Sequence, residues 1–534
     1  MAEPPGPGRP NFLFIITDQQ KAEHLGCYGN ALVRTPHIDR LAAQGWSADR
    51  MFVATPICMP NRATLMTGRM PSVHGVRHNG IPLSLDATTF VHLLADAGYR
   101  TALIGKSHLQ NFTGTPSLVP KPQYPGDPPP ADHAEAWMEA RDASAYEQEW
   151  PPRWRDPGFE MRLPFYGFER VRLCIEHGDE VGGHYERWLR ERAPDADVLR
   201  GAGNAAPAPG LACPQAWRTR VPEELYTTAF VAEETIGALR DWAKGDRPFF
   251  VQCSFPDPHH PFTPPGKYWS MYDPADMVLP PTFEPAGNRT PAHVRWLHAQ
   301  RDAGKAVKHT PALFACTERE AREAMALSFG MIAMIDDAVG RVLAELERLD
   351  LARNTVVIFT TDHGDFMGEH QLMLKGPIHY DAIVRCPFIW FDTGRPAGGR
   401  RSAALCQAPD IPLTILDRAG LAPFHGVQGR SLLPLIAEED TFRDHVLVEE
   451  EGQRVYLGFD RRVRLRTIID ERWRLSLYDG AGWAELYDRR DDPHEMVNLW
   501  DDSGYAAPRA AMLETLAQSM IGASDTSPHP TAIA

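Results

Sequence analysis

Short, nearly continuous apolar runs alternate along the chain with longer amphipathic segments. The runs, rich in Ile, Val and Phe, occupy residues 12–16, 101–104, 249–253 and 355–359. The clearest helical periodicity extends from about Glu318 to Asp350, where one apolar stripe indicates core packing. Strands buried on both faces of a parallel sheet read as continuous apolar runs. The pattern therefore predicts an α/β fold around a central sheet.

Residues 111–225 interrupt this alternation. They hold a Pro-rich stretch from Pro120 to Pro130, the tryptophans Trp137, Trp150 and Trp154, and little clear periodicity. Segments this long in a compact domain are usually lids or binding insertions, so we expect this one to select the substrate, with a structural cover as the alternative. Candidates for contacting a cationic or planar group, or for merely stabilising the fold, are Glu176, Asp179, Tyr185 and Trp188.

The composition is typical of a soluble globular enzyme. The 534 residues are 43% hydrophobic and 23% charged, with a mean hydropathy of −0.35. A net charge of −15 argues against nucleic acid or an anionic membrane as a partner. An anionic substrate must therefore be held by a local group of cations.

Targeting signals and cysteine spacing bear on location. The chain opens without a charged start followed by an apolar stretch and a small-residue cleavage site, and no apolar run is long enough to span a bilayer. Eight scattered cysteines show neither a disulfide framework nor zinc-ligand spacing. We expect a cytoplasmic protein with reduced thiols.

Each of the four apolar runs leads directly into polar, ionisable residues. The segments are Asp18-Gln19, Lys106-Ser107-His108, His259-His260 and Asp362-His363. Ligands of open α/β sheets bind at the carboxyl ends of the strands. Carboxylates from two strand ends with an imidazole predict a divalent cation site. The alternatives are an N-cap or turn role for Asp18 and a Pro-rich surface loop for the two histidines.

A further motif runs from Cys58 to Arg69, Cys-Met-Pro-Asn-Arg-Ala-Thr-Leu-Met-Thr-Gly-Arg. Pro60 fits the first turn of a helix and Gly68 fits the residue just past its end. Cys58 would then lie at a helix N-terminus, where free N–H groups favour anions. For a lone cysteine, burial in the core would be the commoner explanation.

The motif resembles the signature of type I sulfatases, in which the cysteine is oxidised to formylglycine (3-oxoalanine). Asn61 departs from the serine or alanine that many members carry there. The resemblance covers nearly the whole chain in family order. It implies an alkaline-phosphatase-like sandwich with a mixed, mostly parallel sheet. It divides the chain into a catalytic domain over residues 1–437, with 111–225 as the selectivity insertion, and a smaller C-terminal α+β domain over residues 438–534.

The resemblance also implies one divalent metal ion. Its ligands would be Asp18, Gln19, Cys58 (as the aldehyde hydrate), Asp362 and His363. Gln19 stands where sulfatases usually carry a second early aspartate, and His363 is the late variant of that family. Fewer carboxylates and one imidazole favour Mn²⁺ over Ca²⁺, although both remain open.

The catalytic roles follow from the same resemblance. Arg62, Lys106 and Lys375 would hold the substrate oxygens while a hydroxyl of the hydrated aldehyde attacks sulfur. His259, with Lys375, would assist the departing alcohol, and His108 would take a proton when sulfate leaves. Asp365, His370, His379 and Tyr380 flank these segments without an assigned role.

The predicted function is hydrolysis of a small anionic sulfate ester. Phosphonate monoester or phosphodiester hydrolysis with the same nucleophile is the alternative enzyme, and a non-catalytic binding member is the alternative class. A phosphatase or phosphomutase would more naturally offer Ser or Thr at position 58. The partners implied are the formylglycine-generating enzyme during maturation and, by analogy with relatives, further copies of the chain as a homo-oligomer.

Overall fold

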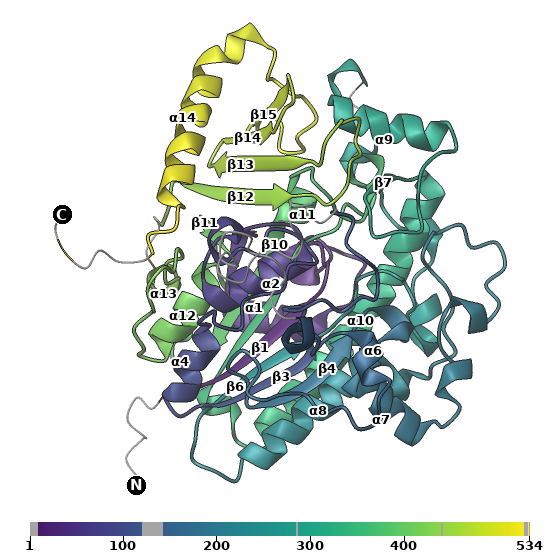
Figure 1. The fold of residues 1–534 in the computed structure, drawn as a ribbon, viewed down its shortest axis with the longest axis vertical. Helices are drawn as coiled ribbons and strands as arrows, with labels where there is room; N and C mark the ends of the chain where they lie inside the picture. The colour runs from purple at the N-terminus through teal and green to yellow at the C-terminus, as the bar shows by residue number, and fades with distance from the viewer. Residues whose placement is uncertain (1–8, 120–142, 285–286, 439–441, 528–531, 533–534) are drawn as a thin grey trace, which may run out of the picture.

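The computed structural model describes residues 9–119, 143–284, 287–438, 442–527 and 532 (Figure 1). The Pro-rich stretch from Pro120 to Pro130 and Trp137 lie outside the described residues.

A central nine-stranded sheet organises the chain. Its order is β11-β2-β10-β8-β1-β6-β3-β4-β5. The strands are β1 (Asn11–Thr17), β2 (Trp46–Phe52), β3 (Arg100–Lys106), β4 (Arg170–Ile175), β5 (Gly182–Gly183), β6 (Phe249–Ser254), β8 (Thr355–Thr361), β10 (Arg385–Asp392) and β11 (Arg400–Gln407). β1 is parallel to β6 and β8, and β3 to β6 and β4, whereas β10 runs antiparallel to β2 and β8. The predicted mixed, mostly parallel sheet is confirmed.

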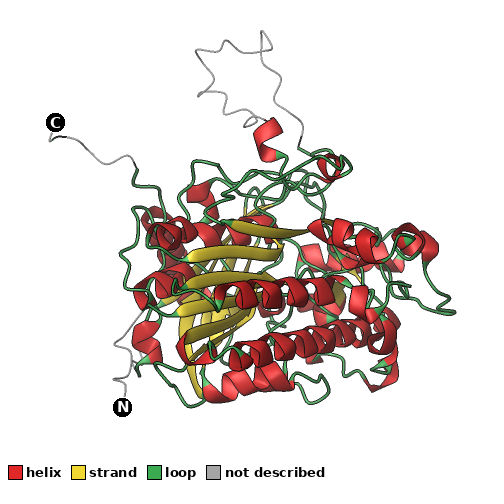
Figure 2. Cartoon of the chain, turned by 90° about the horizontal axis from the view of Figure 1, so that it is seen from below, coloured by secondary structure: helices red, strands yellow, loops and turns green. Residues whose placement is uncertain are grey.

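Two hydrophobic cores lie on opposite faces of this sheet, because successive residues of a strand point to opposite sides. Phe12, Phe14 and Ile16 enter one core, and Leu13 and Ile15 enter the other. Helices cover both faces (Figure 2). The principal ones are α1 (Pro36–Gln44), α2 (Cys58–Thr67), α4 (Phe90–Asp96), α8 (Thr227–Trp242), α9 (Ala292–Asp302), α10 (Glu318–Arg348) and α12 (Asp410–Arg418).

The four expected strands and the long helix all form. Helix α10 begins with a capping box in which Thr317 and Glu320 exchange side-chain and backbone hydrogen bonds. Among the described residues, no helix is both long and apolar enough to cross a membrane.

The segment 111–225 contains more regular structure than its sequence suggested. β4 extends the sheet beside β3, and helices α6 (Pro151–Trp154) and α7 (His184–Arg192) accompany it. Arg172 of β4 pairs with Glu234 of α8, with 2.9 Å between Nε and Oε2. Alternating charged positions near the sheet edge hid this strand from a search for continuous apolar runs.

A separate antiparallel sheet follows in the C-terminal part of the chain. It contains β12 (His445–Glu451), β13 (Arg464–Asp470), β14 (Trp473–Tyr478) and β15 (Ala484–Asp488) in sequence order. Helix α14 (Ala506–Gly522) packs on it through Met512 and Leu516. Figure 1 shows this unit next to the central sheet, as the expected smaller α+β domain. A two-stranded sheet pairs β7 (Phe314–Ala315) with β9 (Leu372–Met373).

Candidate active site

Cys58 is the first residue of helix α2. Ile57 before it is extended, and Gly68 after the helix has φ 64°, with its N–H bonded to Thr64 O at 2.8 Å. A left-handed residue at that position suits glycine. The helix predicted from Pro60 and Gly68 is therefore confirmed, and it is buried along its whole length.

Asn61 connects this helix to the end of β8. Its Oδ1 accepts from the Ala54 N–H at 3.1 Å, and its Nδ2 donates to Asp362 O at 2.6 Å. Asn61, the residue that departs from the signature, thus fixes the start of helix α2, and with it Cys58, relative to Asp362.

Four side chains from three segments, Cys58 among them, converge at one place. The ligand atoms of Asp18, Cys58, Asp362 and His363 all lie within 4.8 Å of one another. Cys58 Sγ is 3.0 Å from His363 Nε2 and 3.8 Å from Asp18 Oδ1. None of the four side chains is more than 1% exposed. The sheet therefore brings these predicted residues together at one edge.

The two aspartates divide their oxygens between cations and this cluster. Asp18 Oδ2 accepts from Lys106, while Asp362 Oδ2 accepts from Arg62 Nε at 2.7 Å. Burial acts to raise the pKa of Asp18, but the charge of Lys106 together with the contributions of His259, His177 and Arg62 holds the pKa well below its usual value. The Oδ1 atoms are left near His363, at 3.9 and 3.6 Å from its Nε2. Two carboxylates and an imidazole fit a divalent cation.

Gln19 joins the cluster in a different way. Its backbone N–H donates to Asp362 Oδ1 at 3.0 Å, whereas its side-chain oxygen accepts from Lys375 and its amide nitrogen donates to Asp365. In this structure the side chain fixes Lys375, and a ligand role for Gln19 stays a prediction.

The two lysines each contact an imidazole. Lys375 Nζ is 2.8 Å from His259 Nε2. Lys106 Nζ is 2.7 Å from Nε2 of His177, which the sequence analysis did not select. Burial and the charge of Lys106 lower the pKa of His177 to about 3, so its ring is neutral. His177 follows the carboxyl end of β4. A search for polar residues after each strand would have found it if β4 had been recognised in the sequence.

Arg62 joins several segments of the site through hydrogen bonds. Its Nε donates to Asp362 Oδ2, and its Nη1 donates to Lys106 O at 3.0 Å and to Ser254 Oγ at 3.1 Å. Arg62 therefore connects the ends of β3, β6 and β8 to helix α2.

His108 has left-handed backbone geometry (φ 57°) and is held by a residue that the sequence analysis missed. The Glu149 carboxylate accepts the N–H groups of His108, Leu109 and Gln110 at 2.8, 3.0 and 3.0 Å. Burial raises the pKa of Glu149 to about 7. The His108 ring packs against Phe112, with centroids 3.6 Å apart, and its Nδ1 has no hydrogen-bond partner among the described residues.

Cys58 differs chemically from the other seven cysteines. Burial acts to raise its pKa, but the charges of Lys106 and Lys375 prevail and lower it. Burial raises the pKa of each of the others: Cys27, Cys174, Cys213, Cys253, Cys316, Cys386 and Cys406. Position 58 is thus the one cysteine in a cationic environment.

Several residues without an assigned role are bonded within the fold. Asp365 accepts from the N–H groups of Met367 and Leu374 at 2.8 and 3.0 Å, which fixes the loop that carries Lys375. The other contacts are those of His370 (stacked on Tyr380), His379 (to Glu450), Asp179 (to Trp217), Tyr185 (to Leu225 O) and Trp188 (to Glu233).

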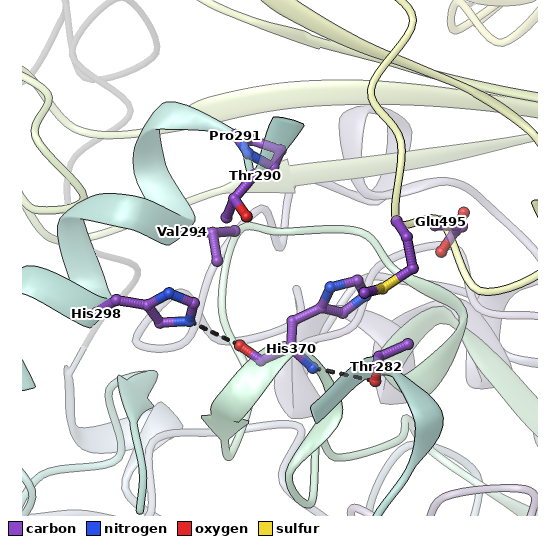
Figure 3. A pocket seen from close by; sticks show the side chains of 8 residues that line it. Thr282, Thr290, Pro291, Val294, His298, His370 and Glu495 are labelled. Atoms are coloured by element: carbon purple, nitrogen blue, oxygen red, sulfur yellow. Dashed lines mark hydrogen bonds between the residues drawn. The ribbon is translucent and has the colours of Figure 1, made fainter. Parts of the chain in front are cut away.

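A small pocket at the seam with the C-terminal domain lies apart from this cluster (Figure 3). It is lined by Thr282, Thr290, Pro291, Val294, His298, His370, Glu495 and Met496. His298 donates to His370 O at 2.8 Å and the His370 N–H donates to Thr282 Oγ1 at 3.1 Å. None of the predicted site residues lines it, so it carries no part of the candidate chemistry.

Comparison with known families gives two matches. The family model described as sulfatase matches residues 10–421. The model described as N-sulphoglucosamine sulphohydrolase, C-terminal, matches residues 368–521.

Individual relatives cover nearly the whole chain. An uncharacterized sulfatase of Escherichia coli (strain K12), YidJ, is 28% identical, with 96% of this chain and 87% of that protein aligned. An arylsulfatase of Clostridium perfringens is 26% identical over 93% of this chain and 91% of its own length. The crystal structure of a phosphonate monoester hydrolase of Agrobacterium radiobacter superposes with a TM-score of 0.74 at 28% identity, covering 97% of both chains.

Proposed function

The chain belongs to the sulfatase family, and from that membership we propose that it is a formylglycine-dependent hydrolase of small anionic sulfate monoesters. The observation that carries the proposal is the position of Cys58 Sγ, within 4.8 Å of ligand atoms of Asp18, Asp362 and His363 and between the charges of Lys106 and Lys375. We also propose that a formylglycine-generating enzyme converts Cys58 to 3-oxoalanine before the protein becomes active.

The donor set supports one divalent cation held by Asp18, Asp362, His363 and residue 58, with Gln19 as a further candidate ligand. When bound, such an ion would polarise an oxygen of the ester and acidify a neighbouring hydroxyl. An imidazole among the oxygen donors favours Mn²⁺ over Ca²⁺, which prefers oxygen ligands alone. The hydrated aldehyde would supply the hydroxyl that bonds to sulfur as the ester S–O bond breaks.

The cations of the chain would hold the other oxygens of the substrate. Arg62 Nη2 has no hydrogen-bond acceptor among the described residues, and its Nε and Nη1 are fixed by Asp362, Lys106 O and Ser254. Arg62 is 2% exposed, Lys106 1% and Lys375 6%. Fixed cations shielded from water stabilise charge that develops during the reaction.

Proton transfer would use Lys375, which contacts His259, and the imidazole of His108. His259 lies against Lys375 through Nε2 and contacts His260 O through Nδ1, so Lys375 carries the shared proton that the departing oxygen needs. His108 stays neutral, because burial and the charge of Lys106 lower its pKa well below the usual value. Its unprotonated nitrogen could therefore accept a proton when sulfate is released.

Phosphonate monoester hydrolysis is the second candidate. The similarity to the Agrobacterium radiobacter enzyme in both fold and sequence favours it, and both substrate classes present a tetrahedral anionic centre to the same cations.

Two measurements test the proposal. Protein made in cells that contain a formylglycine-generating enzyme should give a Cys58 peptide lighter than the cysteine form and reactive with a hydrazide. An unmodified thiol in that protein would contradict the proposal. The ratio of kcat/KM for an aryl sulfate to that for an aryl phosphonate monoester then decides between the two activities, and we expect the sulfate to be the better substrate.

A further inference from the structure

His177 lies at the carboxyl end of β4, inside the candidate site. β4 pairs in parallel with β3 so that Lys106 aligns with Cys174, and the chain turns back towards Lys106 three residues later. His177 Nε2 is 2.7 Å from Lys106 Nζ and 3.5 Å from Asp18 Oδ2. Its ring stacks on His259, with centroids 3.6 Å apart and planes inclined by 7°.

We propose that His177 is a positioning residue that aims the Lys106 ammonium at the substrate anion, as His259 aims Lys375. Two lysine–imidazole pairs, Lys106 with His177 and Lys375 with His259, would then bind the anion, and the two imidazole rings are stacked on each other. This inference rests on the proposed function for its substrate, and neither the family signature nor the sequence analysis pointed to His177.

The hydrogen bonds of the two ammonium groups carry the argument. Lys106 Nζ donates to Asp18 Oδ2 and His177 Nε2, and Lys375 Nζ donates to Gln19 Oε1 and His259 Nε2. An ammonium group has three N–H donors in tetrahedral arrangement. Among the described residues each lysine therefore keeps one donor whose direction its two bonds fix, and this donor is free to bind an oxygen of the substrate.

The direction of the bond assigns the role of the ring. A lysine ammonium has donors only, so the contact of 2.7 Å makes His177 Nε2 the acceptor. Without this acceptor, Lys106 would keep a single fixed bond, to Asp18, and could turn about it. Its free N–H groups would then no longer point to one place.

Neighbouring rings hold His177 in its plane. His259 is stacked between His177 and His260, whose centroid is 4.0 Å from that of His259. Phe112 packs edge-on against His177 at 5.3 Å, and its face lies 5.1 Å from Lys106 Nζ. A ring fixed in this way has a fixed direction for its lone pair.

Three substitutions separate the acceptor from the ring. His177→Phe keeps a stacking ring and removes the acceptor, His177→Gln keeps a carbonyl acceptor without the ring, and His177→Ala removes both. We expect His177→Phe and His177→Ala to lower kcat about 10- to 100-fold, the range seen when a residue that orients a catalytic group is lost. His177→Gln should recover much of this loss.

The matched control is His184→Phe. His184 is the next histidine in the chain after His177, accepts the Leu173 N–H at 3.0 Å and packs on Trp154, so its replacement should leave kcat unchanged. A double-mutant cycle with Lys106→Met separates positioning from folding. If His177 acts through Lys106, the double variant Lys106→Met/His177→Phe is about as slow as Lys106→Met alone.

Binding of inorganic sulfate, measured by calorimetry, gives a readout that needs no turnover. His177→Phe should weaken it about tenfold, by loss of a charge-assisted contact, while His184→Phe should not. Wild-type sulfate affinity and kcat in His177→Phe would overturn the inference. So would a double variant in which the losses of kcat caused by Lys106→Met and His177→Phe multiply. If the wild-type protein hydrolyses neither the sulfate ester nor the phosphonate ester, the proposed function fails. The sulfate affinities still decide the role of His177.

Discussion

Arg62 in helix α2 and Arg474 in the C-terminal sheet are both buried among carboxylates, but they use their donors differently. Arg474 commits all three guanidinium nitrogens, Nε to Glu495, Nη2 to Glu485 at 3.4 Å and Nη1 to Ser476 at 2.9 Å. Arg62 commits Nε and Nη1, while its Nη2 remains 3.6 Å from Asp18 Oδ2. One arginine is fully used by the fold and the other is not.

The surrounding residues repeat this contrast. We call Arg474, Glu485, Glu495, His293 and Tyr478 the interdomain network, since His293 precedes the C-terminal domain in the chain. Glu485 Oε1 accepts from Tyr478 at 2.6 Å and lies 3.2 Å from His293 Nε2, so one cation faces two carboxylates with further donors around them. In the candidate site, cations exceed carboxylates and keep donors without acceptors. The pairing of Arg474 with both carboxylates is what a buried charge needs for stability, and the uncommitted Nη2 of Arg62 is left for a ligand.

Cys58→Ala should separate the two regions most strongly. We expect turnover to fall by about 10⁴-fold or more, since a reaction without its nucleophile retains only the contribution of binding and electrostatics. The interdomain network does not involve Cys58, so the midpoint of thermal unfolding should stay near that of the wild type. Steady-state kinetics and differential scanning calorimetry measure the two effects.

Cys253→Ala is the control for this variant. Cys253 lies in β6, is 1% exposed and has a pKa that burial raises to about 12. Its loss should cost about 1 kcal/mol of stability and leave kcat unchanged. Equal activity losses in the two cysteine variants would contradict the assignment of Cys58 as the source of the nucleophile.

The sequence was sufficient for the parts of the site that follow continuous apolar strands. β1, β3, β6 and β8 are buried on both faces, so their hydrophobic runs are visible without a structure, and the residues after them meet at one edge. The start and end of α2 were equally readable from Pro60 and Gly68.

Other parts depended on contacts that sequence order does not reveal. β4 alternates arginine with apolar residues because Arg172 pairs with Glu234, and with this strand His177 was missed. Glu149 holds the loop after β3 from far along the chain, and Arg474 meets Glu495 only through the fold. Buried charges that are paired over long sequence separations have no local signature.

Removing one cation from each region sharpens the comparison at the next level. Lys375→Met should lower kcat about 10²- to 10³-fold, as expected for loss of a fixed donor to developing charge, with little change in stability. Arg474→Met should instead cost about 3–5 kcal/mol of folding free energy, because it leaves Glu485 and Glu495 buried without their cation. The folded fraction should turn over at a rate close to that of the wild type.

Urea unfolding, together with kcat normalised to the folded fraction, measures both variants. The comparison would break if Arg474→Met lost catalysis without losing stability, because the interdomain network would then act on the reaction. It would also break if Lys375→Met were mainly a stability variant, because the free donor of Lys375 would then serve the fold.

The smallest expected effect is a pH dependence that arises next to the interdomain network. Burial raises the pKa of Glu450 to about 8, and its Oε2 lies 3.0 Å from His379 Nε2. Because the folded state holds this proton more tightly than the unfolded state, stability is lost as the pH rises from about 4.5 to about 8, by at most ~1.4 kcal/mol per pH unit.

Burial lowers the pKa of His379 to about 3, so above pH 7 His379 is neutral in both states and adds no slope. Glu450→Gln keeps a donor for His379 but has no proton to lose, so its unfolding midpoint should fall less than that of the wild type between pH 7 and pH 8. Parallel curves for the two proteins would show that Glu450 is already ionised in the fold, and the C-terminal domain would then contain a buried charge that its neighbours leave unmatched, as the candidate site does.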